Sequence, residues 1–301
     1  MIFYKRLSIV AAIAALCARI SGAAIDRRAG DTFYALNYGI DQNNCPSLDY
    51  VKQQLTTIKP YTSRIKTFAV TTCNLGDLVL QATQSLGLRI YLGIWVSADN
   101  STFESEMAKL LELAHAHSFS NIDGIIVGSE TQYRGDVSPE TLADMISQVK
   151  QSLASAGVNV PVATADVYYK LDPVIVEQVD FVMMNAFPYW EGVAVENAVS
   201  TLFDHYDYMK SLAKGKPVLI GETGWPTRGT NFGSAVPSIS NQETYLKGVL
   251  CQVRQRNIQM CYFEGQDELY KGDDVERSWG FLDSNGNLKA SEYSNIFNSP
   301  C

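Results

Sequence analysis

The apolar run Pro217-Val218-Leu219-Ile220 leads directly into Gly221-Glu222-Thr223-Gly224-Trp225-Pro226-Thr227-Arg228-Gly229-Thr230. The run is typical of a buried strand, and the glycines and proline after it indicate that the strand ends abruptly in a loop. Ile125-Ile126-Val127-Gly128-Ser129-Glu130 repeats this arrangement of apolar strand, small residues and glutamate. A carboxylate in such a position faces a cleft rather than a core. Glu130 and Glu222 are therefore candidates for the two carboxyl groups that glycoside hydrolysis requires.

The composition is that of an ordinary globular protein. The 301 residues are 46% hydrophobic and 19% charged, which is enough for a large core. The net charge of -8 argues against nucleic acid or an anionic membrane as the partner and suits a neutral ligand such as a carbohydrate. No Cys-x-x-Cys pair occurs, and His115, His117 and His205 lie in helix-like or polar stretches. We expect no metal site, no cofactor and no histidine-based triad.

The first residues are typical of a secretory signal peptide. Lys5-Arg6 is basic, Leu7–Leu16 is apolar, and Ser21-Gly22-Ala23 offers small residues for cleavage. The apolar run is too short to anchor the chain across a bilayer. We predict a signal peptide over residues 1–23 and a secreted chain.

The dibasic sequence Asp26-Arg27-Arg28 resembles a processing site, with an exposed arginine pair as the alternative. Cleavage there would remove a short propeptide that ends at residue 28. Residues 29–301 are expected to form one catalytic domain, since no linker or low-complexity segment interrupts them. Nothing in the sequence suggests more than a monomer.

Disulfide bonds are expected because a secreted protein meets an oxidising compartment. Signal removal takes Cys17 away and leaves five cysteines, so one thiol is left over. Cys45 and Cys73 each follow a predicted strand, and their loops could lie side by side. Cys251 lies in a predicted helix, and a bridge from it to Cys301 would tether the tail. The remaining Cys261 lies in an apolar strand, where a buried free thiol is expected.

Asn100-Ser101-Thr102 is a sequon for asparagine glycosylation. It follows a predicted strand, so we expect Asn100 to lie in a surface loop.

Apolar, β-branched runs alternate with amphipathic segments along the chain. The predicted strands are Phe33–Tyr38, Arg64–Ala69, Arg89–Trp95, Ile122–Val127, Val160–Thr164, Phe181–Asn185, Pro217–Gly221 and Ile258–Phe263. The predicted helices are Glu104–His117, Ser138–Ala156, Val195–Lys214 and Gln242–Arg256. Such an alternation predicts an α/β fold, a single (β/α)8 TIM barrel. A doubly wound open sheet is the alternative, but no G-x-G-x-x-G follows the first strand.

The active site of such a barrel lies at the carboxyl ends of its strands. Polar and aromatic residues gather at the predicted ends: Asn37, Tyr38, Trp95, Ser129, Glu130, Tyr133, Asp166, Asn185, Phe187, Tyr189, Trp190, Glu222, Trp225, Glu264 and Asp267. Aromatic faces stack on pyranose rings, and carboxylates and amides bind hydroxyls. We therefore predict that these residues bind a sugar chain.

Several of these residues have a structural alternative. Tyr38, Trp190 and Trp225 could instead be core aromatics, which is the commoner fate of such side chains. Glu264 could orient Glu222, bind a sugar hydroxyl, or form an ion pair with an arginine at a strand end. For Asp166 and Asp267 the two interpretations are equally open.

The strand-end motifs resemble family 17 of the glycoside hydrolases, the β-1,3-glucanases. The matching segments are Ile220–Thr227, Val127–Glu130 with Tyr133-Arg134, Asp180–Trp190, Tyr91–Trp95 and Tyr262–Glu264. They are most similar to the secreted fungal cell-wall branch of glucanosyltransferases and glucosidases, and the likeness covers nearly the whole mature chain. The positions of Cys45, Cys73, Cys251 and Cys301 also resemble that branch.

The resemblance implies a retaining mechanism, with Glu222 as nucleophile and Glu130 as acid/base. It implies β-1,3-glucan as the partner and the cell wall or extracellular space as the location, with transfer of glucan chains favoured beside hydrolysis. The alternatives are hydrolysis alone, by an endoglucanase or glucosidase, or glucan binding without turnover.

Two departures from the family pattern stand out. Ser129 occupies a position where many relatives carry asparagine, which puts a hydrogen bond to the sugar 2-hydroxyl in doubt unless water or Asn185 compensates. Relatives tend to have an aromatic residue near Gln266 and tryptophan at Tyr270, which puts the shape of the acceptor side in doubt.

Overall fold

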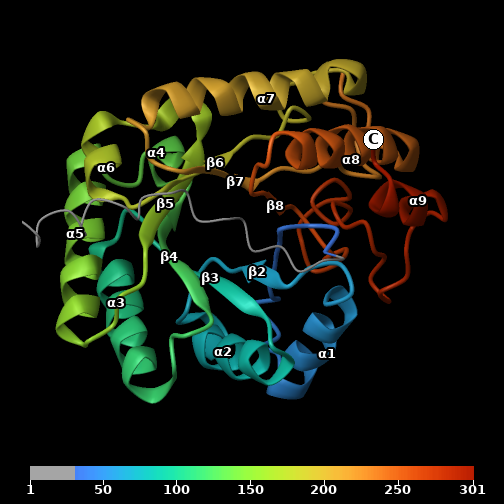
Figure 1. The fold of residues 1–301 in the computed structure, drawn as a ribbon. Helices are drawn as coiled ribbons and strands as arrows, with labels where there is room; N and C mark the ends of the chain where they lie inside the picture. The colour runs from blue at the N-terminus through green and yellow to red at the C-terminus, as the bar shows by residue number, and fades with distance from the viewer. Residues whose placement is uncertain (1–30) are drawn as a thin grey trace, which may run out of the picture.

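Eight parallel strands form the centre of the molecule, and helices surround them (Figure 1). The structure is a computed structural model that describes residues 31–301; the predicted signal peptide, the dibasic site and Cys17 lie outside the described residues. The strand order is β7-β6-β5-β4-β3-β2-β1-β8. A parallel bridge between Ile220 and Met260 brings the two ends of the sheet together. The predicted (β/α)8 barrel is therefore confirmed.

Each predicted strand is present, with shifted bounds. The strands are β1 (Ala35–Asn37), β2 (Arg64–Lys66), β3 (Arg89–Ile94), β4 (Ile122–Ser129), β5 (Val162–Val167), β6 (Val182–Asn185), β7 (Val218–Glu222) and β8 (Cys261–Tyr262).

The helices that follow the strands form the outer layer. They are α1 (Leu48–Ile58), α2 (Leu75–Leu86), α3 (Asn100–Ala116), α4 (Thr131–Arg134), α5 (Pro139–Ser155), α6 (Pro173–Gln178), α7 (Val195–Leu212), α8 (Ile239–Gln255) and α9 (Glu292–Asn298). Two short 3-10 turns, η1 (Thr72–Asn74) and η2 (Tyr168–Lys170), complete the described elements. The four predicted helices correspond to α3, α5, α7 and α8. Ser138 caps α5 by accepting the Thr141 N–H, as a serine before a proline predicts.

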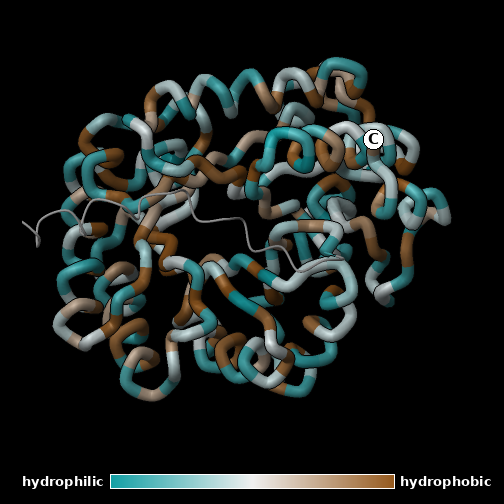
Figure 2. The backbone as a smooth tube through the Cα atoms, in the orientation of Figure 1, coloured by the Kyte–Doolittle hydropathy of each residue, from teal (hydrophilic) through white to brown (hydrophobic). Residues whose placement is uncertain are grey.

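Successive side chains of each strand point to opposite faces of the sheet, so the core has two layers. A large cluster packs between the strands and the helices, and a smaller one fills the barrel interior: Tyr34, Ala35, Tyr91, Ile126, Ala163, Ala165, Phe181, Met183, Leu219 and Cys261. Figure 2 shows hydrophobic residues along the central strands and mixed residues on the outer helices. The interior is therefore a packed core, and function is left to the loops at the strand ends.

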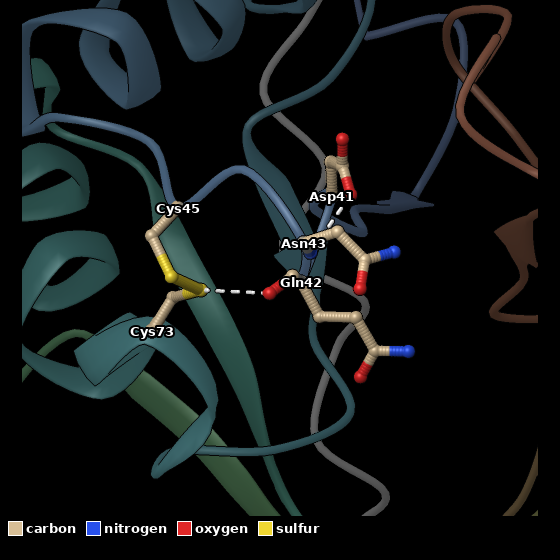
Figure 3. The surroundings of a disulfide bond; sticks show 5 residues. All are labelled: Asp41, Gln42, Asn43, Cys45 and Cys73. Carbon is tan, nitrogen blue, oxygen red and sulfur yellow. Dashed lines mark hydrogen bonds between the residues drawn. A yellow bond between two sulfur atoms is a disulfide. The ribbon is translucent and has the colours of Figure 1, made fainter.

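Two disulfide bonds join the predicted cysteine pairs. Cys45–Cys73 links the loops that follow β1 and β2, with a Cα–Cα distance of 5.2 Å. In Figure 3 the Cys73 sulfur lies near the Gln42 carbonyl oxygen, at 3.7 Å, so the bridge packs against the loop after β1. Cys251–Cys301 ties the last residue to α8, with a Cα–Cα distance of 5.0 Å. Each bridge is expected to contribute about 2–4 kcal/mol.

The predictions for Cys261 and for the sequon at Asn100 have different outcomes. Cys261 is buried and unbridged, as predicted. Asn100 is exposed, but it begins α3 rather than lying in a loop, because Asp99 accepts the Ser101 N–H at 2.9 Å and starts the helix early. No helix within residues 31–301 combines the length and the apolar character needed to cross a membrane.

Candidate active site

Glu222 is the last residue of β7 and is 7% exposed. One of its carboxylate oxygens, Oε1, accepts a hydrogen bond from the Lys66 ammonium at 2.8 Å and one from the Ser129 hydroxyl at 3.1 Å. Lys66 ends β2 and Ser129 ends β4. Three strand ends that are distant in sequence thus meet at this carboxylate.

Glu130 follows β4 in a left-handed conformation, with φ of 57°. Few residues other than glycine adopt this backbone region, and those that do gather at functional sites. The turn is tight, because a Cβ at Gly128 would lie 2.3 Å from the Thr131 hydroxyl oxygen. After the turn, Asp166 accepts the Gln132 N–H at 2.7 Å and so fixes the start of α4. The backbone therefore holds Glu130 at the strand end.

Asn185 connects the two glutamates. Its side-chain amide donates to Glu130 Oε1 at 3.2 Å and to the Ser129 hydroxyl at 3.3 Å. The same hydroxyl donates to Glu222 Oε1. Glu130 and Glu222 thus belong to one hydrogen-bonded network, with Asn185 wholly buried at its centre.

The electrostatics of Glu130 suit a proton donor. Burial raises the pKa of Glu130 to about 7, the Glu222 carboxylate adds to the rise, and the Asn185 hydrogen bond opposes it. A carboxyl group with such a pKa still carries its proton in mildly acidic solution. Its partner Glu222 faces a lysine. Surroundings that differ in this way can give two carboxyl groups different roles.

The pH dependence of activity should follow from this arrangement. We expect activity to fall as pH rises through about 7, since the protonated form of Glu130 is lost there. The profile should be bell-shaped, because Glu222 must also be ionised. Initial rates on a β-1,3-linked oligosaccharide from pH 3 to 9 would measure it. An enzyme active only above pH 8 would contradict the assignment of Glu130 as the acid.

A cleft of about 430 Å³ opens on the Glu130 side of the network. Its lining includes the predicted residues Glu130, Tyr133, Asn185, Phe187 and Trp190, together with Tyr169 and Phe232, which the sequence analysis missed. Four of the rings, those of Tyr133, Tyr169, Trp190 and Phe232, are between 39% and 54% exposed. Exposed aromatic faces beside a buried carboxyl network suit a sugar chain.

A second cleft of about 480 Å³ lies between the loop after β1 and the loop after β8. Asn37, Tyr38, Asp267, Glu268 and Tyr270 are among its lining residues. Asn37 also accepts a hydrogen bond from Lys66, the lysine that contacts Glu222. Glu222 therefore lies between residues of the two clefts. The second cleft is the larger of the two, but neither Glu130 nor Glu222 lines it.

Several predicted sugar contacts turn out to be core residues. Trp225 is wholly buried, and its indole N–H donates to the Val236 carbonyl oxygen at 3.0 Å. Tyr189 is also wholly buried, and its hydroxyl donates to the Thr230 carbonyl oxygen. Neither ring offers a face to a ligand, because the loop after β7 folds back over both. Their prediction as sugar contacts is corrected accordingly.

Trp95 lies against a cation. The Arg134 guanidinium carbon stands 4.4 Å from the centre of the Trp95 ring. Arg134 also donates to the Ser129 carbonyl oxygen at 2.7 Å. The pair thus supports the turn that carries Glu130.

The predicted acidic residues beyond the two glutamates have structural partners. Asp166 accepts backbone N–H groups, as described above. Asp267 pairs with Lys289 at 2.6 Å. Glu264 is 2% exposed and pairs with Lys271 at 3.1 Å, so the predicted ion pair exists with a lysine in place of an arginine, and no hydrogen bond joins Glu264 to Glu222. Burial raises the pKa of Glu264 well above its usual value.

Besides Tyr169 and Phe232, sequence reasoning missed Lys66 and Lys271. The available signal for Lys66 was a lysine between Ile65 and Thr67 inside a predicted strand, where a cation needs a buried partner. Among residues 31–301, no group of three or more His, Cys, Asp and Glu side chains is arranged to hold a metal ion.

Comparisons with known proteins identify the family. The BtgE/BtgC glycoside hydrolase domain matches residues 34–280. A glucan 1,3-beta-glucosidase of Saccharomyces cerevisiae is 35% identical, over 85% of this chain and 90% of the relative, and one of Candida albicans is 32% identical, over 87% and 92%.

The crystal structure of a glycoside hydrolase family 17 beta-1,3-glucanosyltransferase from Rhizomucor miehei is also similar. It has a TM-score of 0.82 and 51% identity, over 86% of this chain and 96% of that chain. An active-site mutant of that enzyme was solved in complex with laminaritriose, with the same similarity to this chain.

Proposed function

The chain belongs to the BtgE/BtgC family of glycoside hydrolases and is an enzyme that acts on β-1,3-glucan; on this premise we propose that it is a retaining enzyme that transfers glucan chains as well as hydrolysing them. The observation that carries the proposal is the network that joins Glu130 to Glu222 through Asn185 and Ser129.

In the first step Glu222 attacks the anomeric carbon of a bound glucan. Glu130 gives its proton to the leaving glycosidic oxygen, for which its pKa of about 7 is suited. The new ester bond holds the glucan on Glu222 while the reducing-end fragment leaves.

In the second step Glu130 is ionised and takes a proton from the incoming hydroxyl. Water as acceptor gives hydrolysis, and a hydroxyl of another glucan gives transfer. Both outcomes use the same two glutamates, so the balance depends on how well the acceptor side holds a sugar and excludes water.

The cleft on the Glu130 side supports transfer. Glu130 is the group that protonates the leaving fragment, so the leaving and incoming sugars occupy its side of Glu222. That side carries the exposed rings of Tyr133, Tyr169, Trp190 and Phe232. We assign this cleft to the acceptor and the cleft beside Asn37 and Tyr38 to the donor chain.

Trp190→Ala should shift the balance toward hydrolysis. Trp190 is 39% exposed, lines the acceptor cleft and is close to the Phe232 ring, with centroids 5.4 Å apart. Loss of its stacking face is expected to lower the ratio of transfer to hydrolysis about tenfold, which corresponds to about 1.4 kcal/mol of acceptor binding. Product ratios on laminarihexaose would measure it. Tyr208→Ala, an exposed ring on α7 that lines neither cleft, is the matched control and should keep the ratio; equal effects of both changes would contradict the assignment.

The proposed location is the cell wall or extracellular space. The predicted signal peptide and the two disulfide bonds support secretion. Asn100 is exposed, so the sequon is open to glycosylation. The proposed unit is a monomer over residues 29–301.

Hydrolysis alone is the second candidate function, and the glucosidase names of the Saccharomyces and Candida relatives favour it. A time course on a reduced laminari-oligosaccharide of defined length, followed by mass spectrometry, separates the two. Products longer than the substrate are expected from transfer. Shorter products alone, even at high substrate concentration, would make the enzyme a hydrolase, and an unchanged substrate would favour glucan binding without turnover.

A further inference from the structure

Lys66 is a wholly buried lysine in the barrel. Its ammonium group lies 2.8 Å from Glu222 Oε1 and 3.1 Å from Asn37 Oδ1, and it stands 4.3 Å from the centre of the Phe68 ring. Burying an ammonium group is costly unless a partner compensates for the lost water. Here the partner is the carboxylate that we propose as the nucleophile.

The two carboxylate oxygens of Glu222 differ in their surroundings. Both donors, Lys66 and Ser129, bind Oε1. Within residues 31–301 no hydrogen bond reaches Oε2. One oxygen is thus held by the protein, and the other keeps its lone pairs for a substrate.

We infer that Lys66 positions the nucleophile. Its ammonium group holds Glu222 through Oε1, so that Oε2 attacks the anomeric carbon. The inference rests on the proposed function and adds to it a residue and the identity of the attacking oxygen. Lys66 itself neither gives nor takes a proton in either step.

The electron balance of the reaction fits this role. In the first step the Oε2–carbon bond forms, the glycosidic bond breaks, and the leaving oxygen takes the proton of Glu130. Oε1 becomes the carbonyl oxygen of the ester and keeps the Lys66 hydrogen bond. In the second step the Oε2–carbon bond breaks and the negative charge returns to a carboxylate that faces the ammonium group. A fixed cation at this position stabilises that charge without having to reorganise.

The experiment compares Lys66→Met, Lys66→Arg and Lys109→Met. The substrate is 2,4-dinitrophenyl β-laminaribioside, whose leaving group needs no acid. For Lys66→Met we expect kcat to fall by about 10²–10³ with KM within about twofold. Lys66→Arg keeps the charge and should recover most of the lost kcat.

Lys109→Met is the matched control. Lys109 pairs with Asp77 at 2.7 Å, and neither residue is among the lining of the two clefts. It should lower the melting temperature and leave kcat and KM unchanged. If Lys66→Met does not fold, Lys66→Gln, which keeps a hydrogen-bond donor without the charge, gives the same readout.

A folded Lys66→Met enzyme with the wild-type kcat would overturn the inference, as would an equal loss of kcat in Lys109→Met. A failure of the proposed function looks different. In that case the wild-type enzyme turns over neither laminari-oligosaccharides nor the aryl glycoside.

Discussion

Glu222→Ala is expected to reduce turnover of β-1,3-glucan by about 10⁴-fold or more. The change removes the oxygen that forms the covalent intermediate, and no other described carboxyl group shares the Lys66 and Ser129 contacts. The fold should persist at a lower melting temperature, because Glu222 ends β7 at the mouth of the barrel but its loss leaves the buried Lys66 ammonium group without its carboxylate partner. Initial rates on laminarihexaose, with circular dichroism as the check on folding, measure both.

Two variants make this result interpretable. Glu222→Gln keeps the size of the side chain and removes only its charge, so it should be as inactive as the alanine variant. Glu292→Ala removes an exposed glutamate of α9, far along the chain from the site, and should leave the rate unchanged. A folded Glu222→Gln enzyme with substantial activity would remove Glu222 from its proposed role.

Glu130→Ala is expected to show a loss that depends on the leaving group. With natural glucan the rate should fall by about 10²–10⁴, since the leaving oxygen receives no proton. With a dinitrophenyl leaving group the first step should be much less affected, and glycosyl-enzyme should accumulate because the second step lacks its base. The alkaline limb near pH 7 should disappear with the carboxyl group that produces it.

Rates on the two substrates, together with intact-protein mass spectrometry, check this prediction. A burst of dinitrophenol followed by slow turnover is the expected time course. Equal losses on both substrates and an unchanged alkaline limb would show that another group supplies the proton. Asp166 is a neighbouring carboxyl group, but its carboxylate is committed to the N–H groups of Gln132 and Val167.

The sequence predicted the architecture because the strands are short apolar runs that each end in glycine, proline or polar residues. The shortest strands were the least well bounded: Phe33–Tyr38 narrowed to Ala35–Asn37, and Ile258–Phe263 narrowed to Cys261–Tyr262. Sheet pairing decides those bounds. Pairing depends on the neighbouring strand, which lies elsewhere in the sequence.

The site was predictable where function is tied to a strand end. Glu130 and Glu222 were identified in this way, and the structure places them in one network with Asn185. The same reasoning overreached for Trp225, because a residue just beyond a strand can turn into the core as easily as into a cleft.

Lys66 escaped prediction for a different reason. Its partner Glu222 is 156 positions away in sequence, and only closure of the barrel brings the two together. A local pattern carries no information about such a pair. The same holds for the Tyr169 and Phe232 rings, which reach the acceptor cleft from loops after different strands.

Azide rescue of the two glutamate variants tests the central claim most directly. With dinitrophenyl β-laminaribioside, azide should restore the Glu222→Ala enzyme and yield the α-glycosyl azide, because azide enters from the face that the missing nucleophile leaves open. The Glu130→Ala enzyme should instead yield the β-glycosyl azide, since azide there attacks the intermediate on Glu222. Product stereochemistry by NMR gives the answer. A β-azide from Glu222→Ala, or an α-azide from Glu130→Ala, would contradict the assigned roles.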